Sequence, residues 1–182
     1  MRAGRAQDAL TAVFLDRDGV INRKAPEGSY VTSPAALELL PGALEGLRLL
    51  ADLDVPVVVV TNQRGIALGR MSEADLERIH ERLRAEVDVA GARLDLIVHC
   101  PHEDGECDCR KPGIGMFERA AQAFPSIELE RSVVIGDSAS DMEAARRIGA
   151  TAVLVGEEAL AGADLVVPSL VAAAELLTAT RS

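Results

Sequence analysis

The sequence is poor in aromatic residues and carries little positive charge. Its 182 residues include no Trp, one Tyr and three Phe, and 29 acidic residues outnumber 19 Lys and Arg, for a formal net charge of −10. Sites for single-stranded nucleic acid use aromatic stacking platforms, and a phosphate backbone is repelled by a negatively charged protein. The composition therefore argues against a nucleic-acid partner, although a small anion could still bind beside local cations.

Long hydrophobic runs are absent as well. No segment approaches the ~20 apolar residues that a membrane helix needs, and no apolar stretch follows the two arginines of residues 1–9 to make a secretion signal. We therefore expect a cytoplasmic protein without a membrane partner. Hydrophobic residues make up 48 % and charged residues 26 %, which is typical of a globular protein, and the length predicts one domain over residues 1–182.

Cysteine is scarce and clustered, since all three lie between Cys100 and Cys109. An odd, clustered set is a poor disulfide framework and a better metal site. Cys100, His102, Cys107 and Cys109 together offer three thiolates and an imidazole, which is a complete tetrahedral zinc set. Four protein ligands leave no open position, so we expect a structural zinc in the loop 100–109. The alternative is three reduced, packed cysteines beside a surface histidine.

Short apolar runs alternate with helical patterns along the chain. Runs rich in β-branched residues are typical of parallel strands covered on both faces, and they occupy residues 12–15, 55–60, 94–99, 133–135, 152–155 and 164–167. This alternation predicts an α/β fold with a doubly wound, Rossmann-like parallel sheet.

Three helices are predicted from their start and stop signals. One begins at Pro41 and buries Leu44 and Leu47. The second follows a capping-box sequence at Ser72 and buries positions 76, 79, 83 and 87. The third has an apolar stripe at positions 142, 145 and 148, and Gly149 ends it.

Polar residues follow the predicted strands at one edge of the sheet. Asp16, Thr61 and Asp137 each come directly after a strand, and the carboxyl ends of parallel strands share one edge. Asp16 and Asp18 are two residues apart, so their carboxylates face the same way on extended backbone. Asp16, Asp18 and Asp137 thus suit magnesium, which prefers oxygen ligands. Alone, the Asp-x-Asp-Gly string could equally be a solvated turn. Asp141 either supports the site or serves only as a negative charge that interacts favourably with the N-terminus of its helix.

Two further segments offer groups that bind phosphate. Thr61-Asn62-Gln63-Arg64-Gly65 supplies a hydroxyl, an amide and accessible backbone N–H groups, although a plain Thr-Asn turn is as compatible with this segment alone. Arg110 and Lys111 follow the cysteine loop, which would hold their positive charges at the same edge. A basic surface pair is the alternative. His80 and His99 have no such neighbours in sequence, and we expect surface or packing roles for them.

Taken in order, these motifs resemble the haloacid dehalogenase superfamily of phosphatases, over residues 13 to about 155. The Cys-Pro-His and Cys-Asp-Cys-Arg-Lys-Pro segments resemble the branch that holds heptose bisphosphate and histidinol-phosphate phosphatases. Residues 14–22 and 61–69 look like the heptose enzymes. The spacings between Asp16, Thr61 and Lys111 leave no room for the large cap domain that many members of this superfamily insert. We therefore expect a fold without one.

The resemblance also implies roles. Asp16 is the nucleophile that becomes an aspartyl-phosphate, and Asp18 is the general acid and base. Magnesium is held by the Asp16 and Asp137 carboxylates and the Asp18 backbone carbonyl, while Thr61 and Lys111 bind the phosphoryl oxygens. The remaining implied residues are substrate contacts: Asn62, Gln63, Arg64, Arg110 and Ser138.

The implied substrate is a phosphorylated sugar, namely a heptose 1,7-bisphosphate that loses its 7-phosphate. Loops 23–31 and 63–70 and the zinc loop would select it, and a monomer would suffice. The short segment 103–106 and Ser138, where the heptose enzymes often have Lys, leave histidinol phosphate open as the substrate. The sequence is also compatible with a non-catalytic zinc-stapled binding module and, more weakly, with a nucleic-acid 3′-phosphatase. Residues 156–182 carry no chemistry that the sequence identifies.

Overall fold

The computed structural model describes residues 9–179, which contain a parallel sheet of six strands. The strands follow the order β3-β2-β1-β4-β5-β6 across the sheet, and the expected doubly wound α/β fold is confirmed. Residues 1–8, which bear on the expected absence of a secretion signal, lie outside the described range. The strands are β1 (Ala12–Leu15), β2 (Val57–Asn62), β3 (Leu96–Cys100), β4 (Ser132–Gly136), β5 (Thr151–Val155) and β6 (Leu165–Val167).

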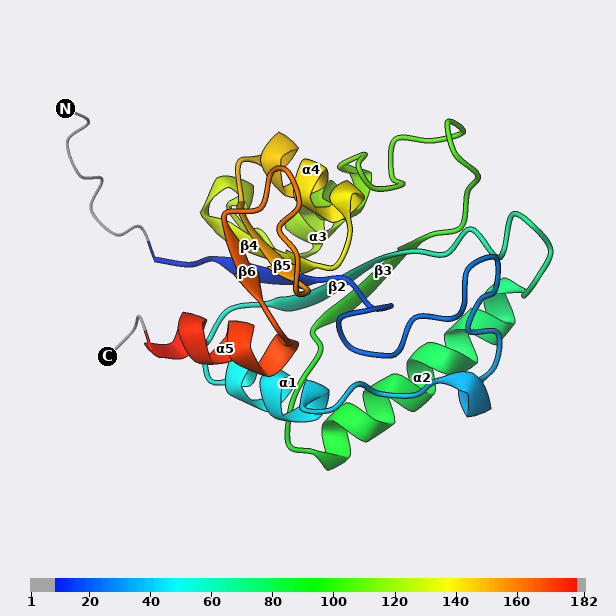
Figure 1. The fold of residues 1–182 in the computed structure, drawn as a ribbon, viewed down its shortest axis with the longest axis horizontal. Coiled ribbons are helices and arrows are strands. Elements are labelled where there is room, and N and C mark those ends of the chain that lie inside the picture. Colours follow the sequence, from blue (N-terminus) through cyan, green and yellow to red (C-terminus); the bar gives the residue numbers. More distant parts are fainter. Residues whose placement is uncertain (1–8, 180–182) are drawn as a thin grey trace.

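Helices cover both faces of this sheet (Figure 1). One face packs against α1 (Ala43–Ala51), α2 (Glu73–Val89) and α5 (Leu170–Ala179), and the other against α3 (Gly115–Ala123) and α4 (Ala139–Ile148). Along β1, Val13 and Leu15 face the first layer while Ala12 and Phe14 face the second. Because both faces are covered, every residue of β1 is buried, which explains the continuous apolar run.

The helix signals in the sequence are largely accurate. Ser72 caps α2 in a reciprocal capping box with Asp75, and the four predicted apolar positions of α2 are buried. Gly149 ends α4 in the left-handed conformation. The expected start of the first helix at Pro41 was wrong by two residues, because Gly42, with φ of 76°, precedes the first helical residue. Gly46 and Leu47 take the inner face of α1, so Leu44 is only partly buried.

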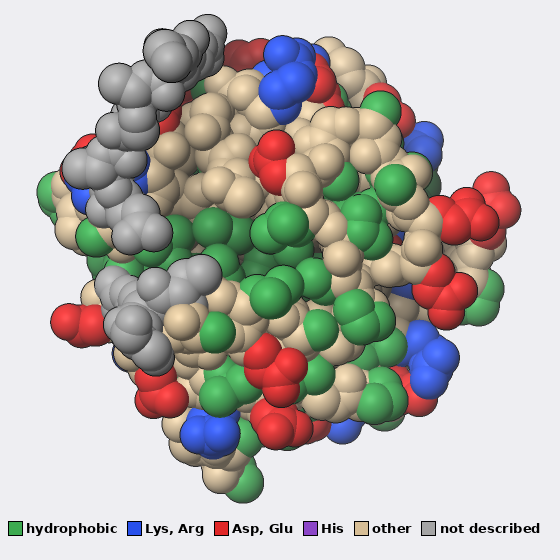
Figure 2. Space-filling view, turned by 60° about the vertical axis from the view of Figure 1, so that its left-hand side comes forward, with side chains coloured by type: hydrophobic (Ala, Val, Ile, Leu, Met, Phe, Trp, Pro, Cys, Tyr) green, Lys and Arg blue, Asp and Glu red, His purple; other side chains and the backbone are tan. Residues whose placement is uncertain are grey.

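The two edges of the sheet differ. β6 ends one side with Leu165 and Val166 exposed, and Figure 2 turns this side toward the viewer, with hydrophobic side chains gathered across it. β3 ends the other side and leads into the cysteine loop. Within residues 9–179, none of the helices has the length and apolar character needed to cross a membrane.

The order in which the chain adds strands to the sheet reverses between β1 and β4, and the site lies at this point. β1 lies between β2 and β4, so the chain crosses to one side after β1 and later returns to the other. Residues 16–42, between β1 and α1, contain the short 3-10 turn η1 (Pro34–Ala36) and no inserted domain. A second 3-10 turn, η2 (Leu129–Arg131), precedes β4. Ligands of such sheets bind in the crevice at the reversal point.

Candidate active site

Three carboxylates converge at the carboxyl ends of β1 and β4. Asp16 follows β1, and its N–H still pairs with the Ile135 carbonyl of β4 at 2.9 Å. Asp137 follows β4, and Asp141 lies in the first turn of α4. One oxygen from each of these three aspartates lies within 4.8 Å of the other two. The structure thus brings Asp16 and Asp137 together as predicted, and it adds Asp141, whose role the sequence left open.

Two glycines permit this close approach. Gly19 has a φ of 93°, and a Cβ there would lie 2.1 Å from Asp137 Oδ2. At Gly136, a Cβ would lie 2.2 Å from the Cβ of Asp141. Real Cβ atoms do not make contacts this short, so any side chain at either position would displace a carboxylate of the cluster.

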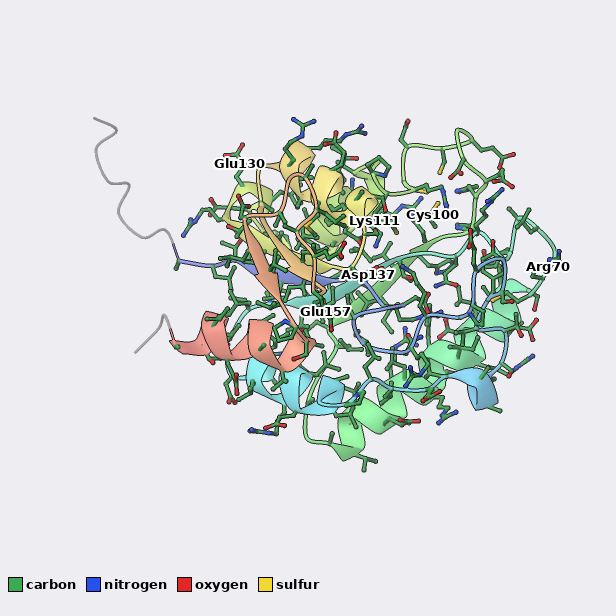
Figure 3. All side chains as sticks on the ribbon, in the orientation of Figure 1. Arg70, Cys100, Lys111, Glu130, Asp137 and Glu157 are labelled. Carbon is green, nitrogen blue, oxygen red and sulfur yellow. The ribbon has the colours of Figure 1, made fainter. Side chains whose placement is uncertain are left out.

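Lys111 supplies the positive charge of the cluster. It is 4 % exposed, and its Nζ lies 2.9 Å from Asp16 Oδ1 and 2.6 Å from Asp141 Oδ1. The ammonium also donates to the Val60 carbonyl at 2.7 Å. Burial alone would lower the pKa of Lys111, but Asp16 and Asp141 together raise it, so the side chain stays protonated. Figure 3 shows Lys111 near Asp137 and Cys100 along one edge of the sheet.

A side-chain clip fixes the backbone at Lys111. The Asn62 amide donates to the Lys111 carbonyl at 3.1 Å, and its oxygen accepts from the Lys111 N–H at 3.0 Å. Asn62 is the last residue of β2, so the clip ties the segment after the cysteine loop to the centre of the sheet. The Lys111–Pro112 peptide bond, just beyond the clip, is cis.

Asp16 is held in an environment that disfavours its charge. Burial raises the pKa of Asp16 to about 7; Lys111 opposes this shift, while Asp141 adds to it. Its Oδ1 also accepts a hydrogen bond from the Arg17 N–H at 2.8 Å. A divalent cation beside Asp16 would favour the ionised form and so reverse the effect of burial.

The aspartate cluster fits magnesium. Asp137 Oδ1 is buried and has no hydrogen-bond partner within residues 9–179, while Asp137 Oδ2 accepts from Lys24 Nζ at 2.7 Å. An unpaired buried carboxylate oxygen is costly unless a cation binds it. Hard carboxylate ligands in a site open to a pocket match the preference of magnesium. Lys24 itself was not predicted as a site residue, although it lies in the loop 23–31 that was expected to select substrate.

Three side chains donate hydrogen bonds to the carboxylate of Asp18. Its carboxylate accepts from Arg17 Nη2 at 2.9 and 3.0 Å, from Asn22 at 2.9 Å and from Gln63 at 2.9 Å. Burial would raise the pKa of Asp18, but the Arg17 charge and these hydrogen bonds together lower it. Asp18 is therefore ionised and oriented in the free protein.

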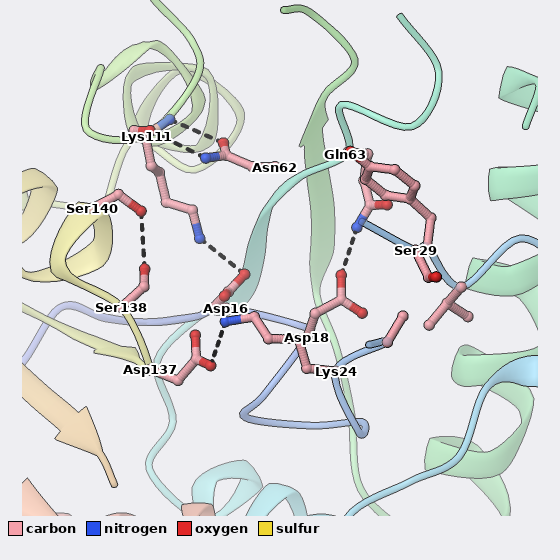
Figure 4. A pocket seen from close by; sticks show the side chains of 13 residues that line it. Asp16, Asp18, Lys24, Ser29, Asn62, Gln63, Lys111, Asp137, Ser138 and Ser140 are labelled. Carbon is pink, nitrogen blue, oxygen red and sulfur yellow. Dashed lines mark hydrogen bonds and ion pairs between the residues drawn. The ribbon is translucent and has the colours of Figure 1, made fainter. Parts of the chain in front are cut away.

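A pocket of about 270 Å³ opens over these groups (Figure 4). Three of the predicted substrate contacts, Asn62, Gln63 and Ser138, line it. Ser138 also caps α4, and its hydroxyl donates to Asp141 at 2.6 Å. Thr61 is buried beneath the pocket, where its hydroxyl accepts from Gln63 at 2.8 Å. The other side chains that line the pocket are Asp16, Asp18, Lys24, Ala25, Ser29, Tyr30, Val31, Lys111, Asp137 and Ser140.

Two predicted substrate contacts do not line this pocket. Arg64 forms an ion pair with Glu103, and Arg110 forms one with Asp104. Both acidic residues belong to the short segment 103–106 of the cysteine loop. The structure therefore places these two arginines beside the loop, where its carboxylates hold them.

The cysteine cluster is compact. The Sγ atom of Cys109 lies 3.2 Å from those of both Cys100 and Cys107, and His102 Nδ1 lies 3.3 Å from Cys109 Sγ. All four ligand atoms lie within 4.8 Å of one another, and the three cysteines form no disulfide. Three sulfurs and one imidazole nitrogen gathered so closely match the donor set and the size of a tetrahedral zinc site.

His80 has a more specific environment than the sequence indicated. It is 2 % exposed on α2, and its Nε2 lies 3.2 Å from Nη1 of the fully buried Arg17. His99 is partly exposed and pairs with Glu73 at 2.8 Å. The expected packing role therefore describes His80 incompletely, because its contact with Arg17 spans distant parts of the chain and gives no local sequence signal.

The chain is similar to known phosphatases in sequence. A family model described as HAD-hydrolase-like matches residues 108–174. D-glycero-beta-D-manno-heptose-1,7-bisphosphate 7-phosphatase of Rhodopseudomonas palustris is 41 % identical, over 76 % of this chain and 79 % of the relative. The corresponding alpha-named enzyme of Mycobacterium bovis is 40 % identical, over 84 % of this chain and 80 % of the relative.

The fold is likewise similar to a solved phosphatase. A crystal structure of D,D-heptose 1,7-bisphosphate phosphatase from B. bronchiseptica, complexed with magnesium and phosphate, superposes with a TM-score of 0.85. It is 33 % identical, and the match covers 94 % of this chain and 99 % of that one. A relative of this fold therefore binds both the metal and the anion that the pocket described above would suit.

Proposed function

Because this chain belongs to the heptose-bisphosphate phosphatase family of haloacid dehalogenase-like hydrolases, we propose that it removes the 7-phosphate of D-glycero-D-manno-heptose 1,7-bisphosphate. Asp16 carries the phosphoryl group as an aspartyl-phosphate. The observation that carries the proposal is the position of Asp16, which is buried, paired with Lys111 and open to a pocket also lined by Asp18 and Asp137. Names of relatives include both anomers, so the proposal leaves the anomer open.

In the first step, a carboxylate oxygen of Asp16 attacks the phosphorus atom. The bond from phosphorus to the sugar C7 oxygen breaks, its electron pair stays on that oxygen, and the oxygen takes a proton from Asp18. Lys111 and Thr61 hold the phosphoryl oxygens as the charge redistributes. Asp18 is ionised in the free protein; the arriving phosphate dianion raises its pKa, so that it takes up a proton from solvent before the step and then passes that proton to the leaving oxygen.

In the second step, water attacks the aspartyl-phosphate. Asp18, now ionised, takes a proton from the water, whose oxygen bonds to phosphorus. The bond between phosphorus and Asp16 breaks, and its electron pair restores the carboxylate as inorganic phosphate leaves. Asp16, Asp137 and the Asp18 carbonyl would hold magnesium, with Asp141 beside them, and the metal would supply positive charge that offsets the repulsion between carboxylate and phosphate.

The cysteine loop has a supporting role in this proposal. Cys100, His102, Cys107 and Cys109 would hold zinc, which would stiffen the loop that leads into Arg110 and Lys111. Closely spaced cysteines without a disulfide are typical of a reducing compartment, which supports a cytoplasmic location. All groups that the mechanism uses come from one chain, which supports a monomer.

Substrate selection falls to the rim of the open pocket. Asn62, Gln63 and Ser138 line the pocket, where a phosphate ester would contact them, and Lys24, which also lines it and is more than half exposed, adds a positive charge. Arg64 and Arg110, held by the cysteine loop, are the remaining proposed contacts for the far end of a long substrate. An open pocket suits a sugar bisphosphate whose second phosphate projects outward.

A phosphate-release assay tests the proposal. The two anomers of the heptose 1,7-bisphosphate, a heptose 1-phosphate and histidinol phosphate are compared at equal concentration with magnesium present. We expect one or both bisphosphates to give the highest kcat/KM, with release of the 7-phosphate alone. Faster turnover of histidinol phosphate would overturn the substrate, and no release from any compound would overturn the catalytic function.

A further inference from the structure

The residue between the two catalytic aspartates is a buried arginine that the mechanism above does not use. Arg17 is fully buried. Its Nη2 donates to both oxygens of Asp18, and its Nη1 lies 3.2 Å from His80 Nε2 on α2. The N–H groups of a guanidinium removed from water need acceptors; here Nη2 has the Asp18 carboxylate and Nη1 has the His80 imidazole, while Nε has no hydrogen-bond partner among the described residues.

The chemistry of the pair fixes the state of His80. Arginine has only donors, so His80 Nε2 must be the acceptor, and the imidazole must be neutral with its proton on Nδ1. Burial lowers the pKa of His80 to about 3, with the charge of Arg17 as the next cause, which agrees with that assignment. The ring of His99 lies 6.0 Å from that of His80, and its Nε2 pairs with Glu73 instead.

We propose that His80 is a positioning residue: by accepting from Arg17, it holds the guanidinium in the orientation that aims Asp18 at the leaving oxygen. The inference rests on the proposed function, because it acts through the acid role of Asp18. Without an acceptor at position 80, Nη1 of the buried guanidinium has no hydrogen-bond partner. The Arg17 side chain then rotates toward another acceptor. Asp18 then loses the contact to both of its oxygens and keeps only Asn22 and Gln63.

A comparison of two leaving groups separates this role from simple packing. A sugar alkoxide leaves only with a proton from Asp18, whereas p-nitrophenolate leaves without one. The quantity measured is kcat/KM for heptose 1,7-bisphosphate divided by kcat/KM for p-nitrophenyl phosphate. Because kcat/KM covers steps up to departure of the leaving group, hydrolysis of the aspartyl-phosphate does not enter the ratio.

The variants are His80→Phe, which keeps a ring without an acceptor, and His80→Gln, which restores an acceptor. His80→Leu replaces His80→Phe if the latter does not fold. We expect His80→Phe to lower the ratio about tenfold, a part of the roughly 10²–10⁴-fold that a general acid contributes, and His80→Gln to return most of it. Ile79→Val, which trims the buried face of the same helix and leaves the hydrogen-bonding groups of Arg17 and His80 in place, is the control and should leave the ratio unchanged.

Asp18→Asn shows how far the ratio of the two kcat/KM values falls when the general acid is lost completely. If wild type releases no phosphate from either compound, the proposed function fails. If Asp18→Asn lowers the ratio but His80→Phe lowers both substrates equally, the positioning role is overturned while the mechanism stands. An unchanged ratio in Asp18→Asn would overturn the acid role and the positioning role together.

Discussion

Two groups of side chains that could each hold a metal ion lie at the carboxyl ends of the strands of one sheet, and they differ in their ligand atoms and in their access to the pocket. The aspartate cluster of Asp16, Asp137 and Asp141 already contains a buried ammonium from Lys111, and it opens into a pocket. The cysteine cluster comprises Cys100, His102, Cys107 and Cys109, whose ligand atoms crowd one another at the end of β3.

This difference suits the aspartate cluster to catalysis and the cysteine cluster to stabilising the fold. Hard oxygen ligands that share their charge with a lysine bind a cation loosely and leave room for a phosphate. Three thiolates and an imidazole would surround a cation completely, so they would fix a loop and exclude substrate. Damage to the first cluster should therefore abolish turnover and spare the fold, whereas damage to the second should weaken the fold and spare part of the turnover.

The largest expected effect is the loss of turnover in Asp16→Asn. An amide cannot form the acyl-phosphate, so we expect phosphate release to fall by roughly 10⁴-fold or more, the scale for loss of a covalent nucleophile. The fold and the zinc content should be unchanged in circular dichroism and metal analysis. Asp54→Asn is the matched control, because residue 54 has a positive φ of 43° that asparagine tolerates. Substantial residual release in Asp16→Asn would rule out this nucleophile.

The next effect concerns the cysteine cluster. Chelator-washed wild type should retain about one zinc per chain, and Cys109→Ser should retain none. We expect the free energy of unfolding to fall by about 4 kcal/mol or more in Cys109→Ser, the range for a lost structural metal. Phosphate release per folded molecule, measured at low temperature, should remain detectable. Wild type that contains no zinc and keeps full stability would contradict the supporting role.

A smaller effect should appear when pH is varied. Burial raises the pKa of Asp16 to about 7 in the metal-free protein, so below this pH the carboxylate must lose a proton before it binds magnesium. The magnesium concentration for half-maximal phosphate release should therefore rise as pH falls, by roughly tenfold per unit below pH 7. Magnesium titrations between pH 5.5 and 8 measure this, with zinc content as the control. The same half-maximal concentration at every pH would be evidence against competition by a proton.

The smallest effect is expected at the rim of the aspartate cluster. Lys24 pairs with Asp137 at 2.7 Å but is more than half exposed, and exposed ion pairs contribute little. Lys24→Met should therefore strengthen magnesium binding by about two- to fivefold, because a competing cation is removed. Calorimetric titration without substrate measures the change. Arg23→Met, which breaks the neighbouring surface pair with Glu38, should leave it unaltered; weaker binding in Lys24→Met would reverse the interpretation.

The sequence predicted the fold and the meeting of Asp16 with Asp137 because both depend on local patterns. Apolar runs identify strands, and the parallel topology brings their carboxyl ends to one edge. His80 and Lys24 could not be found this way, because their contacts with Arg17 and Asp137 depend on how a helix and a loop pack in three dimensions. For Asp141 the sequence left two roles open, one at the start of its helix and one at the site. Both are found, because one oxygen accepts from the Ser138 N–H at the start of α4 and the other pairs with Lys111.

The Asn62 clip has a consequence for how such enzymes can vary. Lys111 is fixed at the base of the cysteine loop, by hydrogen bonds to β2 and by its position two residues after Cys109. The tip at 103–106 lies beyond these anchors, where chains commonly tolerate insertions. A loop of another length could therefore leave Lys111 in place while it moves Arg64 and Arg110, which pair with Glu103 and Asp104 of the tip, so the pocket and its rim can change independently.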